Sequence, residues 1–134
     1  MDIRQAGGHA FTTHCLIRLK GRKSGRTRIT PLIYGDVGGE VVIVASKGGA
    51  DEHPDWYRNL CESEHVDVQI ATQAFRATWR EPKDVERHSI WNFMVEIYPP
   101  YLSYQASTER HIPVVMLSPG AAIDVFQESD IQSP

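Results

Sequence analysis

Hydrophobic and polar residues alternate along several short stretches of the chain. Phe11, Thr13, Cys15, Ile17 and Leu19 share one face of an extended segment, while polar residues occupy most of the other face. A repeat of two residues predicts a half-buried strand. By the same reasoning, we expect strands over residues 27–35, 40–46, 65–70, 74–80 and 112–117.

Two other segments have helical spacing. Asp51 and Pro54 favour the start of a short helix, in which Trp56 and Leu60 form an apolar i, i+4 pair. A longer helix of about four turns is predicted from residues that fall on one side: Val85, His88, Trp91, Met94, Val95 and Tyr98. The prolines at 99 and 100 end it, and we expect a further helical turn within residues 101–110.

The connections between the strands indicate the fold class. Gly38-Gly39 and residues 71–73 suit hairpins, and hairpin links cannot build an alternating parallel sheet, which needs crossover connections. The 134 residues are therefore expected to form one α+β domain, a small antiparallel barrel with flanking helices. We assign the domain to residues 11–117, between a flexible N-terminus at 1–10 and a polar, acidic tail at 118–134.

Basic residues are concentrated in one place. Six of the fourteen lysines and arginines lie between Arg18 and Arg28, around the sequence GRKSGRTR. The net charge is −3, and three acids in the tail account for it, so residues 1–117 are neutral. A protein that binds nucleic acid or an anionic membrane usually carries a basic surplus over its whole domain. The expected partner of this turn is therefore a small anion.

The glycines of the basic turn predict its backbone geometry. Gly21 and Gly25 allow a tight turn whose N–H groups point the same way, which is a phosphate nest. A Walker A loop is excluded, because the lysine precedes the second glycine and a strand follows. The alternative is a solvated hairpin with incidental charge. A second glycine-rich turn, ASKGG at 45–49, carries Lys47, which we expect to reach the same anion.

Aromatic residues indicate a place for a flat ligand. Tyr98, Tyr101 and Tyr104 recur every third residue, so on a helical turn they line one face and could cover an aromatic ring. Core packing is the alternative for Trp56. It is the expected role of the other two tryptophans, Trp79 and Trp91.

Cysteines and histidines exclude several chemistries. Cys15 and Cys61 form no Cys-x-x-Cys motif, and both are expected to be buried packing residues. No apolar run near the N-terminus is typical of a signal or a membrane span, so a reducing cytoplasm is the expected location. The six histidines are scattered, which predicts no metal site, and no Gly-x-Ser-x-Gly elbow indicates hydrolysis.

Three longer blocks carry a more specific signal: GRKSGRTRITPLIYG, VVIVASKGGADEHPDWYRNL and IYPPYLSYQASTERHIPVVML. In this order and spacing they closely resemble the deazaflavin-dependent nitroreductase family of actinobacteria, over roughly residues 15–117. The resemblance implies a split β-barrel and the deazaflavin coenzyme F420, which carries a phosphate and an oligoglutamate tail. Clustered arginine and lysine suit a multiply anionic tail, which agrees with the basic turn.

The resemblance also implies roles for individual residues. The phosphate and tail are assigned to residues of the two glycine-rich turns: Arg22, Lys23, Ser24, Arg28 and Lys47. The deazaflavin ring is assigned to Pro31, Ala45, Ser46 and Trp56, and the substrate pocket to Tyr98, Tyr101 and Tyr104. Ile33 departs from the pattern, because the nitroreductase that names the family has a tyrosine there, near the substrate. The short polar N-terminus also lacks that protein's membrane-associating segment, so we expect a soluble protein without stable membrane association.

The expected function is that of an F420-dependent reductase. It would transfer hydride from C5 of the reduced deazaflavin to a small electron-poor molecule: a nitroaromatic, an enone or enoate, or a quinone. Ser46 or Tyr98 is the expected hydrogen-bond donor to the oxygen where negative charge develops. The alternatives are a related barrel that binds flavin mononucleotide, a deazaflavin carrier without turnover, and a barrel that grips nucleic acid, which the neutral domain disfavours. A monomer or homodimer is expected.

Overall fold

A computed structural model describes residues 14–127, within which the chain forms seven strands and four helices. The strands are β1 (His14–Lys20), β2 (Thr27–Ile33), β3 (Gly35–Val37), β4 (Glu40–Val44), β5 (His65–Ile70), β6 (Gln73–Arg80) and β7 (Val114–Ile123). The helices are the 3-10 helix η1 (Lys47–Gly49), α2 (Asp55–Cys61), α3 (Asp84–Ile97) and α4 (Pro100–Ala106).

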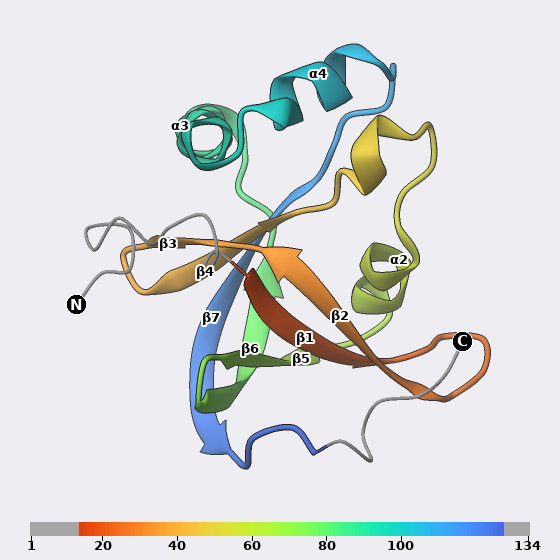
Figure 1. The fold of residues 1–134 in the computed structure, drawn as a ribbon, viewed down its shortest axis with the longest axis vertical. Coiled ribbons are helices and arrows are strands. Elements are labelled where there is room, and N and C mark those ends of the chain that lie inside the picture. Colours follow the sequence, from red (N-terminus) through yellow and green to blue (C-terminus); the bar gives the residue numbers. More distant parts are fainter. Residues whose placement is uncertain (1–13, 128–134) are drawn as a thin grey trace.

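The strands form one antiparallel sheet in the order β2-β1-β5-β6-β7-β4-β3. Figure 1 shows that the sheet curls strongly, with α3 and α4 together above the β3–β4 end and α2 on the side of β1 and β2. Because β2 also contacts β4, the two edges of the curled sheet approach each other. The predicted antiparallel barrel with flanking helices is confirmed.

Hairpins join the strands largely as predicted. β5 and β6 pair around a turn at 71–72, and β3 and β4 pair around Gly38-Gly39, where both glycines have positive φ. β1 and β2 pair along their full lengths, which leaves residues 21–26 as the basic turn. The single strand expected over 27–35 is instead two strands, because Tyr34 separates β2 from β3. Pro31 lies on β2, which is an edge strand, as its missing N–H favours.

Apolar residues form two clusters on the two faces of the sheet. The first cluster includes Cys15, Ile17 and Leu19, so the alternation predicted for β1 is confirmed over the described residues. The second packs the outer face against α3 and α4. β4 is buried on both faces, which explains why its sequence is apolar without interruption. Val41 and Ile43 belong to the first cluster, and Val42 and Val44 belong to the second.

Two burial predictions are wrong. Val85 was expected on the apolar face of the long helix, but it is 80% exposed; Ile90 and Met94 are the buried residues of α3. The first turn of this helix is held instead by Glu86, which pairs with Arg80 of β6. Cys61 is exposed, because the last turn of α2 buries the adjacent Leu60.

The last strand is longer than its sequence predicts. β7 was expected to end at Leu117 but continues to Ile123, and Ser118–Ile123 pairs with β6. Except for Ile123, these residues are small and mostly exposed, so they carry little side-chain pattern, and backbone pairing with β6 holds them. The boundary assigned at 118 thus falls inside a strand.

The expected flexible residues 1–10 lie outside the described residues. Within the described part, no helix has both the length and the apolar character needed to cross a membrane.

Candidate functional site

The basic turn between β1 and β2 closes with two backbone hydrogen bonds. The Gly21 amide donates to the Arg26 carbonyl (2.7 Å), and the Gly25 amide donates to the Gly21 carbonyl (2.9 Å). Gly25 has a φ of 73°, a left-handed conformation that favours glycine. The two glycines therefore make the tight turn that the sequence predicts.

The backbone amides of this turn are largely used inside the protein. Besides those of the two glycines, the Arg22 amide donates to Oδ1 of Asn59 (3.0 Å) and the Arg26 amide to Oγ of Ser24 (3.1 Å). Asn59 is a buried residue of α2, and a buried amide oxygen needs such partners. The predicted phosphate nest is therefore wrong for these four amides. An anion at the turn has to be bound mainly by side chains.

Side chains at the turn divide into paired and unpaired cations. Arg22 is half-buried; its Nη1 donates to Asn59 Oδ1 (2.9 Å) and its Nη2 lies 3.6 Å from Asp55 Oδ1. By contrast, four exposed cations have no acidic partner within residues 14–127: Lys20, Lys23, Arg26 and Arg28. We call these four the unpaired cations.

A hollow of about 420 Å³ opens beside the turn. Its lining combines the turn with the end of α2: Lys20, Gly21, Arg22, Lys23, Ser24, Gly25, Asn59, Glu62 and Ser63. Glu62 is the single acid in this lining, against three basic side chains, so the hollow has a positive surplus. Such a surface attracts an anionic group.

Lys47 lies in a different part of the molecule. It belongs to η1, which packs against α4, and its Nζ is 3.6 Å from Oε2 of Glu52. Figure 1 shows η1 and the basic turn well separated, with α2 between them. Lys47 therefore does not line the hollow at the basic turn.

The residues expected around a flat ring differ in exposure. Ala45 and Trp56 are buried, and both belong to the first apolar cluster. Pro31 is exposed on the edge strand β2, and Ile33, the last residue of β2, is half-buried. Ser46 is half-buried, and its side chain makes no capping bond to η1 or any other hydrogen bond within the described residues. Its hydroxyl is thus available as a donor.

The three tyrosines come together as the sequence predicts. The ring centroids of Tyr98 and Tyr101 are 5.0 Å apart, those of Tyr101 and Tyr104 are 6.3 Å apart, and the hydroxyls of Tyr98 and Tyr104 are 3.2 Å apart. Tyr101 is buried, and this burial is the main cause that raises its pKa. The hydrogen bond between Tyr104 and Tyr98 is the main cause that raises the pKa of Tyr104. These two hydroxyls therefore keep their protons at neutral pH.

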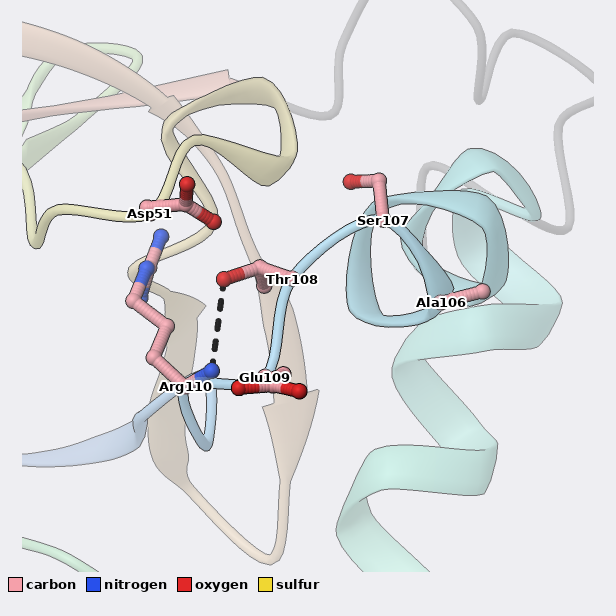
Figure 2. Close-up of a pocket in the computed structure, with 6 residues that line it drawn as sticks. All are labelled: Asp51, Ala106, Ser107, Thr108, Glu109 and Arg110. Atoms are coloured by element: carbon pink, nitrogen blue, oxygen red, sulfur yellow. Dashed lines mark hydrogen bonds between the residues drawn. The ribbon is translucent and has the colours of Figure 1, made fainter.

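Sequence reasoning missed Arg110. Its guanidinium donates to the carbonyls of Ala45, Ser46 and Ala50, in the loop that follows β4. Figure 2 shows the side chain pointing away from α4 toward Asp51, while its backbone amide donates to Oγ1 of Thr108 (3.2 Å). These side chains line a second hollow, of about 440 Å³. The partners lie 60 to 65 positions apart in the chain, so no local motif could have identified them.

Comparisons with known proteins agree with one another. A family model described as F420H(2)-dependent quinone reductase matches residues 3–119. A Mycobacterium tuberculosis protein provisionally named as such a reductase is 36% identical over 104 residues, which span 78% of this chain and 87% of that protein. A solved structure described as an F420-H2 dependent reductase is 39% identical, covers 79% of this chain and 94% of its own, and has a TM-score of 0.72. Another, described as a domain-swapped dimer, is 33% identical, covers 87% and 96%, and has a TM-score of 0.73.

Proposed function

The chain belongs to the F420H2-dependent quinone reductase family, and from this premise we propose that it reduces a small quinone by two electrons. Its fold is the split β-barrel, its cofactor is coenzyme F420, and it is an F420-dependent reductase. When bound, the reduced coenzyme supplies a hydride from C5 of its deazaflavin ring. The protein has to hold that ring, hold the acceptor beside it and stabilise the charge that develops.

The basic turn fits the anionic part of the coenzyme. F420 carries a phosphate and an oligoglutamate tail, and the four unpaired cations provide the positive charge that such a tail needs. We assign the tail to Lys23 and Arg28, with Ser24 beside them. Arg22 shapes this surface, because Asn59 already holds its guanidinium. Lys47 does not line the hollow at the basic turn, from which η1 is well separated. We therefore assign Lys47 to the phosphate of the coenzyme, which is nearer the ring than the oligoglutamate tail.

The ring is assigned to the loop after β4. Ser46 presents a hydroxyl without a partner in the described chain. Ala45 and Trp56 are buried. They would therefore pack behind the residues that contact the ring and would not contact it directly themselves. Pro31 is exposed on β2 and would form a wall at the sheet edge.

The substrate side is assigned to the tyrosines and Ile33. Reduction of a quinone places negative charge on its oxygen, and an O–H donor aimed at that oxygen stabilises the transition state. The observation that carries this proposal is the Ser46 hydroxyl, which has no partner within residues 14–127, on a loop that packs against α4. That helix carries Tyr104, whose hydroxyl bonds that of Tyr98. Solvent then supplies the proton. Ile33 adds apolar surface where a nitroreductase would have a tyrosine, which favours a quinone over a nitroaromatic.

The assembly is a separate part of the proposal. One solved relative is described as a domain-swapped dimer, which supports a homodimer for this chain. Light scattering of the purified protein across a dilution series measures this directly: a homodimer holds twice the chain mass of 15.1 kDa.

Anaerobic steady-state assays test the function. Menadione, a nitroaromatic and an enone are each offered with F420H2, NADPH or reduced flavin mononucleotide as the reductant. We expect turnover with F420H2 alone, and the highest kcat/KM with menadione. Equal turnover with NADPH would contradict the coenzyme assignment, while tight F420 binding without turnover of any acceptor would indicate a carrier.

A further inference from the structure

The loop between β4 and α2 holds one residue, Lys47, in an unfavourable backbone conformation. Lys47, Gly48 and Gly49 have φ values of 46°, 62° and 85°, so three successive residues are left-handed. Glycine tolerates this region, but a residue with a Cβ is disfavoured there. Contacts from elsewhere in the protein therefore have to hold the loop in place.

One guanidinium supplies three of those contacts. Arg110 donates through Nε to the Ala50 carbonyl (2.6 Å), through Nη1 to the Ala45 carbonyl (3.2 Å) and through Nη2 to the Ser46 carbonyl (2.7 Å). A planar guanidinium offers five N–H donors in fixed directions, which suits three carbonyls at once. A lysine ammonium at this position could not reach all three.

His53 completes the arrangement. Its Nδ1 lies 3.0 Å from Nη1 of Arg110, and it accepts a hydrogen bond there only when that nitrogen carries no proton. Burial is the main cause that lowers the pKa of His53, and the charges of Arg110 and Arg58 lower it further, while Glu81 opposes them. A neutral His53 beside a charged Arg110 is therefore the stable pair at neutral pH.

The segment before Arg110 also joins the loop to α4. Ser107 Oγ donates to the Gly49 carbonyl (3.0 Å). A Cβ placed on Gly49 would lie 2.9 Å from Cα of Tyr104, so only glycine allows this close approach. The loop that carries Ser46 and the helix that carries Tyr104 thus pack as one unit.

We propose that Arg110 is a positioning residue of the reductase, which fixes the loop at 45–50 so that the Ser46 hydroxyl stays in place relative to Tyr98 and Tyr104. The proposal rests on the function proposed for Ser46. Arg110 acts through the loop carbonyls, because the three carbonyls and His53 already use four of the five N–H donors of its guanidinium.

The first test measures the loop without any coenzyme or turnover. In Arg110→Met, the amides of Gly49 and Ala50, which donate to Ser46 and Lys47, should exchange with deuterium roughly tenfold faster, because local opening becomes easier. The pKa of His53, followed by NMR, should rise once the neighbouring cation is lost. Arg80→Met is the matched control, since it removes an equally well-bonded arginine elsewhere and should leave both readouts unchanged.

The second test asks whether the loop matters through Ser46. With menadione and saturating F420H2, Arg110→Met should lower kcat roughly tenfold, and because the same loop is assigned to the ring, the F420 dissociation constant should also rise. Arg110→Lys should restore part of kcat. In a double-mutant cycle with Ser46→Ala, the kcat of the double variant should be only slightly lower than that of the slower single variant, because both changes disable the same hydroxyl.

The outcomes separate this inference from the proposed function. Unchanged amide exchange in Arg110→Met would overturn the claim that Arg110 fixes the loop, whether or not the protein turns over. Faster exchange with normal kcat, or additive losses in the cycle, would overturn the positioning role while the reductase function stands. No turnover by the wild-type protein would overturn the proposed function, and the exchange data would still decide whether Arg110 holds the loop.

Discussion

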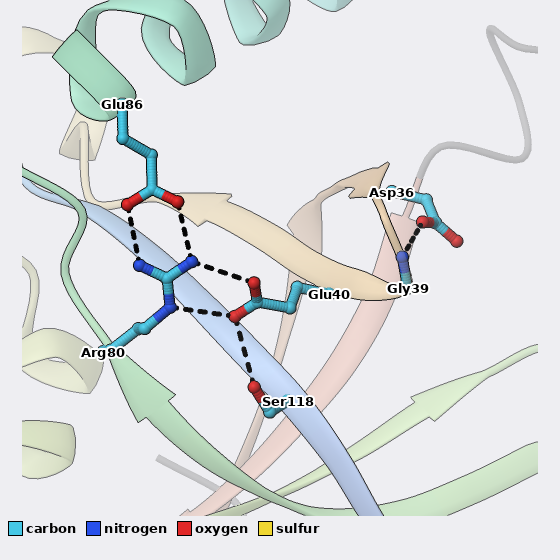
Figure 3. Close-up of polar contacts among 6 residues, drawn as sticks. All are labelled: Asp36, Gly39, Glu40, Arg80, Glu86 and Ser118. Atoms are coloured by element: carbon cyan, nitrogen blue, oxygen red, sulfur yellow. Dashed lines mark hydrogen bonds and ion pairs between the residues drawn. The ribbon is translucent and has the colours of Figure 1, made fainter.

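The arginine at position 80 and the basic turn use positive charge in opposite ways. Figure 3 shows the Arg80 guanidinium between two carboxylates: Nε and Nη2 donate to Glu40 (3.1 and 2.9 Å), while Nη1 and Nη2 donate to Glu86 (2.8 Å each). Ser118 Oγ adds a hydrogen bond to Glu40 (3.2 Å). This network links β6 to β4, β7 and α3, and its partners all lie within the chain.

The four unpaired cations in and beside the basic turn have no such acid within residues 14–127. Like charges close together repel each other, so this arrangement does not stabilise the folded protein by itself. An external anion removes that repulsion. The contrast teaches that the number of charges is a poor guide to a ligand site, whereas the absence of internal partners is a good one.

Removing two unpaired cations should have the largest effect on coenzyme binding. We expect Lys23→Met with Arg28→Met to weaken F420 binding by at least about a hundredfold, because each charge-assisted hydrogen bond contributes on the order of 1.5–3 kcal/mol. The melting temperature should stay within about 2 °C of wild type, since exposed residues without partners contribute little to folding. Fluorescence titration and calorimetry measure the two quantities. A large loss of stability with normal affinity would instead assign the turn a structural role.

A third region, the tyrosine cluster, should affect turnover rather than affinity. Tyr98→Phe removes one hydroxyl and should lower kcat with menadione roughly tenfold, because one donor to the developing oxyanion is lost. The F420 dissociation constant should remain unchanged. Tyr57→Phe is the matched control, because its hydroxyl bonds Glu81 outside the site, and its kcat should be normal. A normal kcat for Tyr98→Phe would exclude Tyr98 as a donor.

Breaking the Arg80 network should have the smallest effect, and only on stability. Arg80→Met should cost on the order of 1 kcal/mol, because the pairs are partly exposed and screened by solvent. Arg80 is the main cause that lowers the pKa of Glu40 from its ordinary value of 4.5. This stabilisation is therefore complete above pH 4.5 and is lost as the pH falls through the lowered pKa. Thermal unfolding of wild type and variant should differ at pH 7, and the difference should shrink steadily as the pH is lowered below 4.5; a constant difference would contradict this cause.

The sequence predicts most of the fold because local pattern and fold agree here. β1 alternates as a strand with one buried face should, and the β3–β4 turn has the glycines that its backbone requires. Spacing along a helix does not say which side chains will meet a neighbour. Val85 has helical spacing, yet its side chain is 80% exposed, so this prediction is wrong. β7 runs past Leu117 on backbone pairing alone.

The candidate site was predictable only in part, for the same reason. Clustered cations and regularly spaced tyrosines are visible in the sequence. Whether a cation has a partner is not, because Arg22 finds Asn59 and Asp55 on α2, more than thirty positions away. The Arg110 contacts span still longer separations. The sequence therefore indicated which residue types bind an anion, but not which of them the protein already uses.

The most direct test of the central claim compares F420 with the deazaflavin chromophore that lacks the phosphate and oligoglutamate tail. Dissociation constants for both are measured by fluorescence in the wild-type protein, Lys23→Met and Arg80→Met. If the unpaired cations hold the tail, the ratio of the chromophore's dissociation constant to that of F420 should be the same in wild type and Arg80→Met. In Lys23→Met this ratio should fall roughly tenfold, because F420 binds more weakly while the chromophore binds as before. A preference for F420 in Lys23→Met equal to that of the wild type would contradict the claim.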